Sequence, residues 1–113
     1  MNDTIQHELF EPTETCPPAP IPAGALWREL TIVNKKGLHA RATAKFVQCT
    51  ESFTAEMTVT RCGETVGGNS IMGILTLGAG QGATITVTAK GEDALEALDA
   101  IEALVASRFG EHE

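Results

Sequence analysis

The feature that most constrains the fold is a repeated change of hydrophobic period between Trp27 and Val105. Stretches in which every second residue is apolar, as in a half-buried strand, alternate with stretches of helical period, in which apolar residues recur every three or four positions. A small sheet with helices packed on one face fits such a string. We therefore predict an α/β (α+β) open-faced sandwich of order β-α-β-β-α-β-α, in which a four-stranded antiparallel sheet is covered on one face by three helices.

Glycine-rich turns and polar caps set the predicted boundaries. We expect strands at 27–34, 53–60, 65–66 and 83–89, and helices at 40–49, 70–77 and from 94 onward. Asn69 or Ser70 caps the middle helix, because both side chains are good N-caps. The predicted buried face of the first helix contains Ala40, Ala44, Phe46 and Val47. That of the last helix contains Ala94, Leu95, Leu98, Ile101, Leu104 and Val105.

Composition divides the chain into two parts. Residues 1–26 hold four acidic residues, no Lys or Arg, and a proline-rich run, which predicts a flexible N-terminal arm ahead of a domain at 27–113. With a formal net charge of −7 and few aromatic residues, the chain does not fit a nucleic-acid binder. It has neither a spanning apolar run nor a signal peptide, so we expect a cytoplasmic protein that does not enter the membrane.

Three cysteines, Cys16, Cys49 and Cys62, are widely spaced and form no CxxC pair. This pattern supports neither a disulfide framework nor a zinc site. We expect all three to be reduced thiols with a structural role, and we expect neither a metal nor a cofactor.

The most unusual chemistry lies around His39. Four of the eight basic residues fall between positions 35 and 45, and no acidic residue occurs from Leu30 to Thr50, although the whole chain is acidic. A cationic segment on an anionic protein usually faces an anion or an acidic partner.

The position of His39 at the start of a predicted helix favours a nucleophilic imidazole. The positive end of the helix dipole and the neighbouring cations disfavour the imidazolium form. If the ring attacks a phosphoryl group, the free N–H groups of the helix start and Arg41 could hold the resulting anion. Gly37 permits the tight turn before the ring. A surface histidine without a chemical role remains the alternative.

Two motifs resemble the HPr family, the histidine-containing phosphocarriers of the bacterial phosphoenolpyruvate-dependent phosphotransferase system. The first is Gly37-Leu38-His39-Ala40-Arg41, which is similar to the family's active-site motif. The second is Asn69-Ser70-Ile71-Met72-Gly73, which resembles its regulatory-serine segment. The resemblance covers residues 27 to about 108. One departure is Ala42, because the family usually has proline after the arginine.

The resemblance implies a stoichiometric carrier of the sugar-transport system that is not an enzyme in its own right. His39 would accept a phosphoryl group from Enzyme I at Nδ1 and pass it to an enzyme IIA domain, while Arg41 stabilises the phosphate. Ser70 would be the target of an HPr kinase/phosphorylase. The implied docking residues are Ala40, Lys45, Ile71, Met72 and Leu75, and a carrier that exposes His39 to two partners is expected to be a monomer.

Three alternatives remain open. A regulatory nitrogen-type carrier, which is not coupled to sugar uptake, is the nearest. A small metal-binding module would need clustered ligands that His39 lacks nearby. A nucleotide-binding enzyme is suggested by the glycines of residues 78–82, but this run is neither GxGxxG nor a P-loop and precedes a strand.

Overall fold

The sheet and helices follow the predicted order. The structure is a computed structural model that describes residues 16–112. Its strands lie in the spatial order β1, β4, β2, β3, and all pairings are antiparallel. The strands are β1 (Leu26–Thr31), β2 (Glu56–Arg61), β3 (Glu64–Gly67) and β4 (Thr84–Lys90). The helices are α2 (Ala40–Glu51), α3 (Ile71–Thr76) and α4 (Ala94–Ala106), followed by a 3-10 turn, η2 (Arg108–Gly110).

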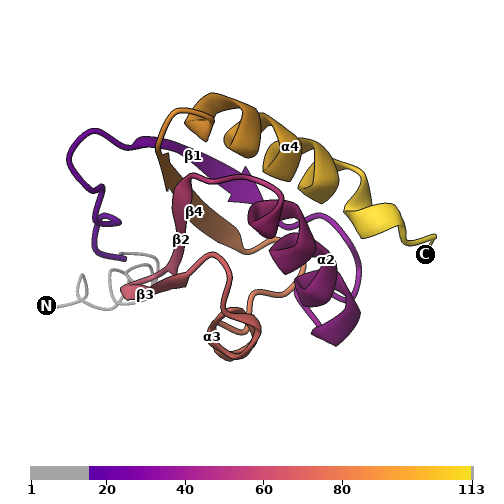
Figure 1. The fold of residues 1–113 in the computed structure, drawn as a ribbon. Coiled ribbons are helices and arrows are strands. Elements are labelled where there is room, and N and C mark those ends of the chain that lie inside the picture. The colour runs from indigo at the N-terminus through magenta and orange to yellow at the C-terminus, as the bar shows by residue number, and fades with distance from the viewer. Residues whose placement is uncertain (1–15, 113) are drawn as a thin grey trace, which may run out of the picture.

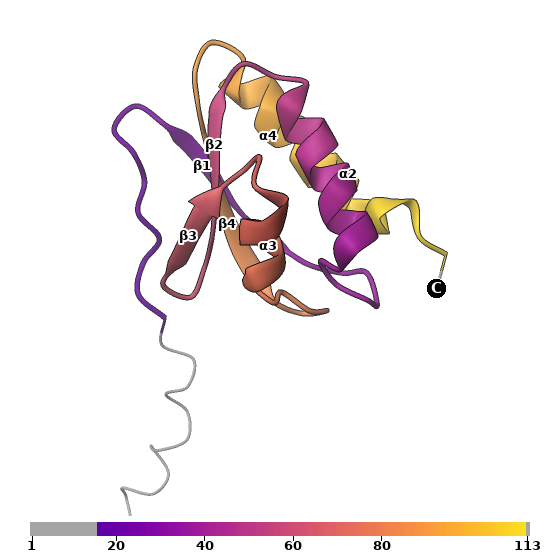
Figure 2. The same ribbon diagram turned by 60° about the horizontal axis from the view of Figure 1, so that its bottom comes forward.

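The three helices form one layer. Figure 1 shows α2 and α4 on the same side of the sheet, and Figure 2 shows α3 beside α2. The predicted open-faced sandwich is therefore confirmed.

Alternation along the strands separates two faces of the sheet. Val59, Ile85 and Val87 are fully buried in the core beneath the helices. Thr58 and Thr88 point the other way, and their hydroxyl oxygens are 2.6 Å apart in a hydrogen bond. We call this second surface, which is defined by Thr58, Thr60, Thr86 and Thr88, the open face.

Two details of the predicted helix faces are wrong. Ala40 and Ala44 are exposed, and α2 instead buries Ala42, Thr43, Phe46, Val47 and Thr50. Alanine buries too little surface to choose the orientation of a helix, whereas Phe46 is large and fully buried. In α4, Leu95 is 53% exposed, because the neighbouring Ala94 and Leu98 occupy the face that meets the core.

A two-residue turn connects β2 to β3. Arg61 and Glu64 pair across it, while Cys62 and Gly63 both have positive φ, of 43° and 90°. Two consecutive positive φ values are typical of the hairpin turns that match the twist of antiparallel strands. The predicted strands at 53–60 and 65–66 therefore form a hairpin.

The cysteine prediction is wrong in one respect. Cys16 and Cys62 form a disulfide, and only Cys49 is a free thiol among the cysteines. The pairing is invisible in the sequence because 46 positions separate the two residues. They meet only because the N-terminal segment returns to the β2–β3 turn, where their Cα atoms are 4.8 Å apart.

The predicted arm is described only from residue 16, and residues 16–25 contain neither helix nor strand. Its residues 1–15 lie outside the described part of the chain. Across residues 16–112, none of the helices combines the length and apolar character that crossing a bilayer requires.

Candidate functional site

His39 occupies the N-cap of α2, as predicted. Its ring Nδ1 accepts a hydrogen bond from the backbone N–H of Arg41 at 3.3 Å, and its own carbonyl oxygen accepts from the N–H of Thr43. An N-cap side chain that accepts from the residue two positions along satisfies one of the unpaired donors of the helix start. Nδ1 therefore holds a lone pair and points at the end of α2 that attracts anions.

Gly37 fixes the path of the chain into His39. Its φ is +68°, and a Cβ there would lie 2.6 Å from the carbonyl oxygen of Ala79 and 2.7 Å from Cα of Gly80. The N–H of Leu38 donates to the same Ala79 carbonyl at 2.9 Å. The glycine run at 78–82 therefore packs directly against the loop that leads to His39.

A carboxylate from the other end of the chain completes the surroundings of the ring. Nε2 of His39 lies 2.5 Å from Oε2 of Glu111, and Oε1 of Glu111 accepts from Nδ2 of Asn34 at 3.0 Å. Because Nδ1 accepts from a backbone N–H, the ring proton belongs on Nε2, where it donates to Glu111. Figure 2 shows the C-terminal end of the chain beside the start of α2.

The hydrogen bonds from His39 and Asn34 lower the pKa of Glu111 below its usual value, so that its carboxyl group is ionised at neutral pH. Sequence reasoning missed this residue, because 72 positions separate it from His39 in the chain. The ring has cations beyond Nδ1 and an anion at Nε2.

η2 brings Glu111 to this position. Arg108 and Phe109 have positive φ, of 60° and 57°, which turns the chain back after α4. The side chain of Phe109 is buried in the core, and its carbonyl oxygen accepts from Nζ of Lys45 at 2.7 Å. A large apolar residue just beyond the last helix is the only sequence signal that could have indicated this anchor.

Cations line a hollow next to the ring. It has a volume of about 250 Å³ and is bounded by Lys36, Arg41, Lys45 and residues 110–112. Arg41 is exposed, so its guanidinium can reach an anion held at the helix start. Lys45, a predicted docking residue, donates one hydrogen bond from its ammonium group to the Phe109 carbonyl oxygen and lines the same hollow.

The second predicted motif lies on α3. Ser70 is its N-cap, with its hydroxyl oxygen accepting from the N–H of Gly73 at 3.0 Å. Ile71 is 43% and Met72 is 70% exposed, while Leu75 is only half-buried. The same helix buries Ile74, so the exposed residues belong to a face that the core does not use. α3 lies beside α2 (Figure 2), which places these apolar side chains on the helix layer that contains His39.

The geometry suits one kind of chemistry. A nitrogen lone pair, an anion-attracting helix start and a guanidinium lie together, and a carboxylate faces the opposite nitrogen of the ring. Within residues 16–112, no three His, Cys, Asp or Glu side chains gather in a way that could hold a metal ion.

Comparison with known proteins decides the family. The sequence model "PTS HPr component phosphorylation site" matches residues 27–107. This chain belongs to the HPr family of phosphotransferase-system phosphocarriers. The phosphocarrier protein HPr of Cupriavidus necator is 49% identical over 88 residues, which are 78% of this chain and 99% of that protein.

The phosphocarrier protein NPr of Shewanella violacea is 46% identical over 86 residues, 76% of this chain and 94% of its own. Among solved structures, HPr-C-His from Thermoanaerobacter tengcongensis matches with a TM-score of 0.75 and 40% identity. The match covers 78% of this chain and 99% of that one. The HPr relatives therefore share both the sequence and the arrangement of the sheet and helices.

Proposed function

We propose that residues 27–113 act in the cytoplasm as a stoichiometric carrier that takes a phosphoryl group from Enzyme I onto His39 and passes it to an enzyme IIA domain. The observation that supports this most directly is the orientation of the ring, in which Nδ1 has a lone pair at the helix start while Nε2 carries the proton toward Glu111. The proposed arm ahead of this domain ends at residue 25, one residue before the predicted boundary, because Leu26 is the first residue of β1.

In the transfer step, the Nδ1 lone pair attacks phosphorus and the bond between phosphorus and the donor breaks. The backbone N–H of Arg41, which donates to Nδ1 in the free ring, is then available to a phosphoryl oxygen, and the Arg41 guanidinium binds another. Positive charge that develops on the ring is balanced by the Glu111 carboxylate at Nε2. Transfer to the acceptor reverses these steps.

Radiolabel from phosphoenolpyruvate, supplied through Enzyme I, tests the proposal. The unmodified chain should gain one acid-labile phosphate and His39→Ala should gain none, because the His39 Nδ1 at the start of α2 is the proposed acceptor. His112→Ala is the matched control, since His112 lines the same hollow. Acid-labile label that persists in His39→Ala would show that the phosphate sits elsewhere.

We further propose that Ile71, Met72 and Leu75, with Ala40 and Lys45 on α2, form the surface on which both partners dock. Exposed apolar side chains beside a charged site are a common feature of interaction surfaces. Interfaces that form and release during transfer are small, and we expect the carrier to act as a monomer. Sedimentation showing a stable dimer that covers His39 would contradict this.

Ser70 is the proposed regulatory site for an HPr kinase/phosphorylase. A phosphate here would keep its place at the N-cap of α3 but would add a charge of roughly −1.5 to −2 next to the exposed Met72. We predict that phosphorylation by the kinase and ATP slows transfer from Enzyme I and is abolished in Ser70→Ala. Thr76→Ala, which removes an exposed hydroxyl on the same helix, should leave phosphorylation unchanged.

The nitrogen-type carrier is the second candidate. It is favoured by the similarity to an NPr protein, which is close to the similarity to HPr proteins. Transfer of label from this chain to a sugar-specific IIA domain would support the sugar branch. Transfer only to a nitrogen-type IIA domain would support the other.

A further inference from the structure

The Cys16–Cys62 disulfide joins two surface segments and shares no residue with the phosphoryl site. Cys16 lies in the arm and Cys62 in the β2–β3 turn, and both are exposed. The inference below uses no residue of the phosphoryl site, and it rests on the proposed function only for the cytoplasmic location.

Residues 16–25 run the length of the sheet. At one end Cys62 follows the last residue of β2, and a Cβ on Gly63 would lie 3.5 Å from Cγ of Pro17. At the other end a Cβ on Gly24 would lie 3.6 Å from Cε of Lys90, which pairs with Glu56 at the start of β2. We call residues 16–25 the strap.

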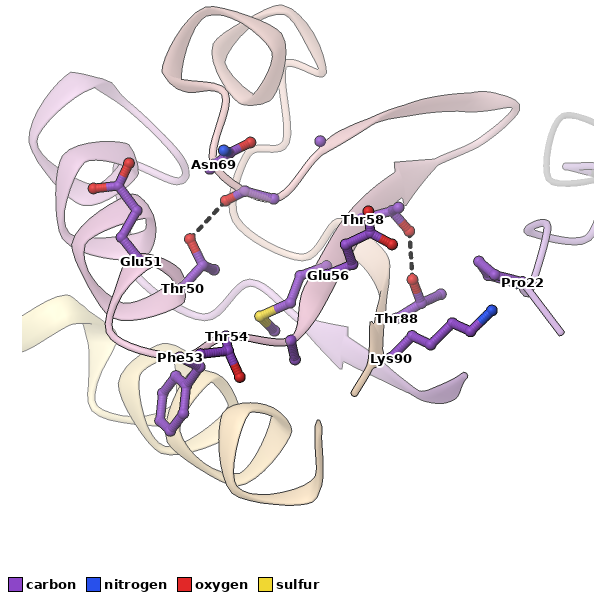
Figure 3. Close-up of a pocket in the computed structure, with 14 residues that line it drawn as sticks. Pro22, Thr50, Glu51, Phe53, Thr54, Glu56, Thr58, Asn69, Thr88 and Lys90 are labelled. Carbon is purple, nitrogen blue, oxygen red and sulfur yellow. Dashed lines mark hydrogen bonds between the residues drawn. The ribbon is translucent and has the colours of Figure 1, made fainter. Parts of the chain in front are cut away.

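The strap lies over the open face. Pro22 lines a groove of about 620 Å³ together with Thr58, Thr88 and Lys90. Figure 3 shows Pro22 on the Lys90 side of this groove, opposite the α2 residues. In Figures 1 and 2 the strap passes along the side of the sheet that faces away from α2 and α4.

Hydrogen bonds do little to hold the strap in place. In the described part of the chain, no hydrogen bond joins residues 16–24 to the sheet, and the N–H of Ala25 donates to Pro22 within the strap itself. Nearly all of its residues are exposed, and none belongs to the hydrophobic core. The disulfide therefore fixes one end of the strap, while β1 fixes the other.

We propose that Cys16 and Cys62 form a reversible redox site that fastens the strap across the open face when oxidised and releases it when reduced. Disulfides in cytoplasmic proteins are usually transient or redox-sensing, and exposed disulfides are the ones that thiols reach. Because the core uses no strap residue, reduction leaves the domain folded and frees only residues 16–25. Release also removes the Pro22 wall of the groove.

The chemistry is thiol–disulfide exchange. A thiolate of a dithiol reductant, such as a thioredoxin-type protein, attacks one sulfur of the Cys16–Cys62 bond and forms a mixed disulfide. Its second thiol then resolves the mixed disulfide, leaving two protein thiols and one oxidised reductant, a transfer of two electrons and two protons. Glutathione disulfide drives the reverse reaction and leaves as two glutathione thiols.

The test uses the full chain before and after treatment with dithiothreitol. Alkylation followed by mass measurement should add one adduct, on Cys49, to the oxidised chain and three to the reduced chain. Backbone order parameters of residues 19–25 should fall from about 0.85 toward values below about 0.6 on reduction, while core amides keep their chemical shifts. Glutathione disulfide should restore the first state.

Three variants sharpen the result. Cys16→Ser should behave as the reduced chain under all conditions. Cys62→Asn should do the same; asparagine is chosen because it tolerates the positive φ of residue 62 in this turn. Cys49→Ser is the matched control and should switch like the unmodified chain.

Several results would overturn the proposal. Alkylation that adds three adducts before any reductant is present would show that the disulfide does not form. Order parameters of residues 19–25 that reduction leaves unchanged, or unfolding of the core on reduction, would show that the disulfide does not specifically fasten the strap. Failure of glutathione disulfide to reoxidise the two thiols would show that the site is not reversible.

Discussion

At the scale of single residues, the site joins two ends of the chain: His39 caps the start of α2, and Glu111 lies beyond η2. The glycine, the helix start and the arginine that define His39 are neighbours in the chain, so local rules predict their geometry. Glu111 reaches the ring because two non-glycine residues, Arg108 and Phe109, adopt positive φ. Each of these two backbone conformations costs about 1–2 kcal/mol, and the burial of the Phe109 side chain in the core offsets this cost.

The Glu111 carboxylate should matter for transfer more than for folding. We predict that Glu111→Gln lowers the initial rate of phosphorylation by Enzyme I roughly ten- to a hundredfold, the range expected from a hydrogen bond to a charged group of about 1.5–3 kcal/mol. The glutamine side-chain oxygen can still accept a hydrogen bond from Nε2–H, but the neutral amide cannot balance positive charge on the ring. Rapid-quench measurement of labelled His39 gives the rate.

Glu92→Gln is the control for loss of one surface carboxylate, because Glu92 is exposed at the start of α4. It should transfer at the unmodified rate. Equal rates for Glu111→Gln and the unmodified chain would show that the ring needs no partner at Nε2.

At the scale of elements, the sequence predicted existence and order better than orientation. Periods of two and 3.6 residues are local properties, so strands and helices could be assigned from them. The face that α2 buries was mistaken because its alanines fit several faces equally well, and Phe46 decides among them only through contacts with the sheet.

Asp93 connects α4 to the loop before β2. Its carboxylate accepts from the N–H groups of Thr54 and Ala55, both at 2.8 Å, and from the Thr54 hydroxyl. The backbone N–H of Thr54 contributes most to lowering the pKa of Asp93 below its usual value of 3.8, and the N–H of Ala55 adds to the effect. Because the folded pKa lies below the unfolded one, this contribution to stability is present above about pH 4 and is lost as pH falls through the folded pKa.

Asp93→Asn should therefore lower the melting temperature at pH 7, and the difference from the unmodified chain should shrink as the pH falls below about 4. Thermal unfolding followed by circular dichroism at both pH values measures it. Glu92→Gln changes the adjacent residue and should show no such pH-dependent difference. A deficit of Asp93→Asn that is the same at both pH values would indicate that the charge is not responsible.

At the scale of the molecule, two long-range contacts that the sequence did not predict complete the fold. The strap returns to the β2–β3 turn through Cys16, and the C-terminal end returns to α2 through Phe109. Both join segments far apart in the chain, so neither has a local pattern. The sandwich itself could be predicted because apolar residues recur every second position in its strands and every three or four positions in its helices.

Phe109 couples the stability of the whole domain to the site. We predict that Phe109→Ala lowers the free energy of unfolding by about 3–5 kcal/mol, because a fully buried aromatic side chain leaves a cavity. Since the same residue anchors the segment that carries Glu111, the folded fraction of this variant should also transfer phosphate more slowly. Chemical denaturation and rapid-quench transfer, normalised to folded protein, measure the two effects separately.

Phe109→Leu separates anchoring from aromatic packing. It should lose less stability than Phe109→Ala and keep most of the transfer rate, because leucine still fills the core position and still holds the backbone that leads to Glu111. In contrast, Glu111→Gln should lose transfer with little loss of stability. If folded Phe109→Ala transfers at the unmodified rate, Glu111 reaches His39 without this anchor, and the core and the site are not coupled through η2.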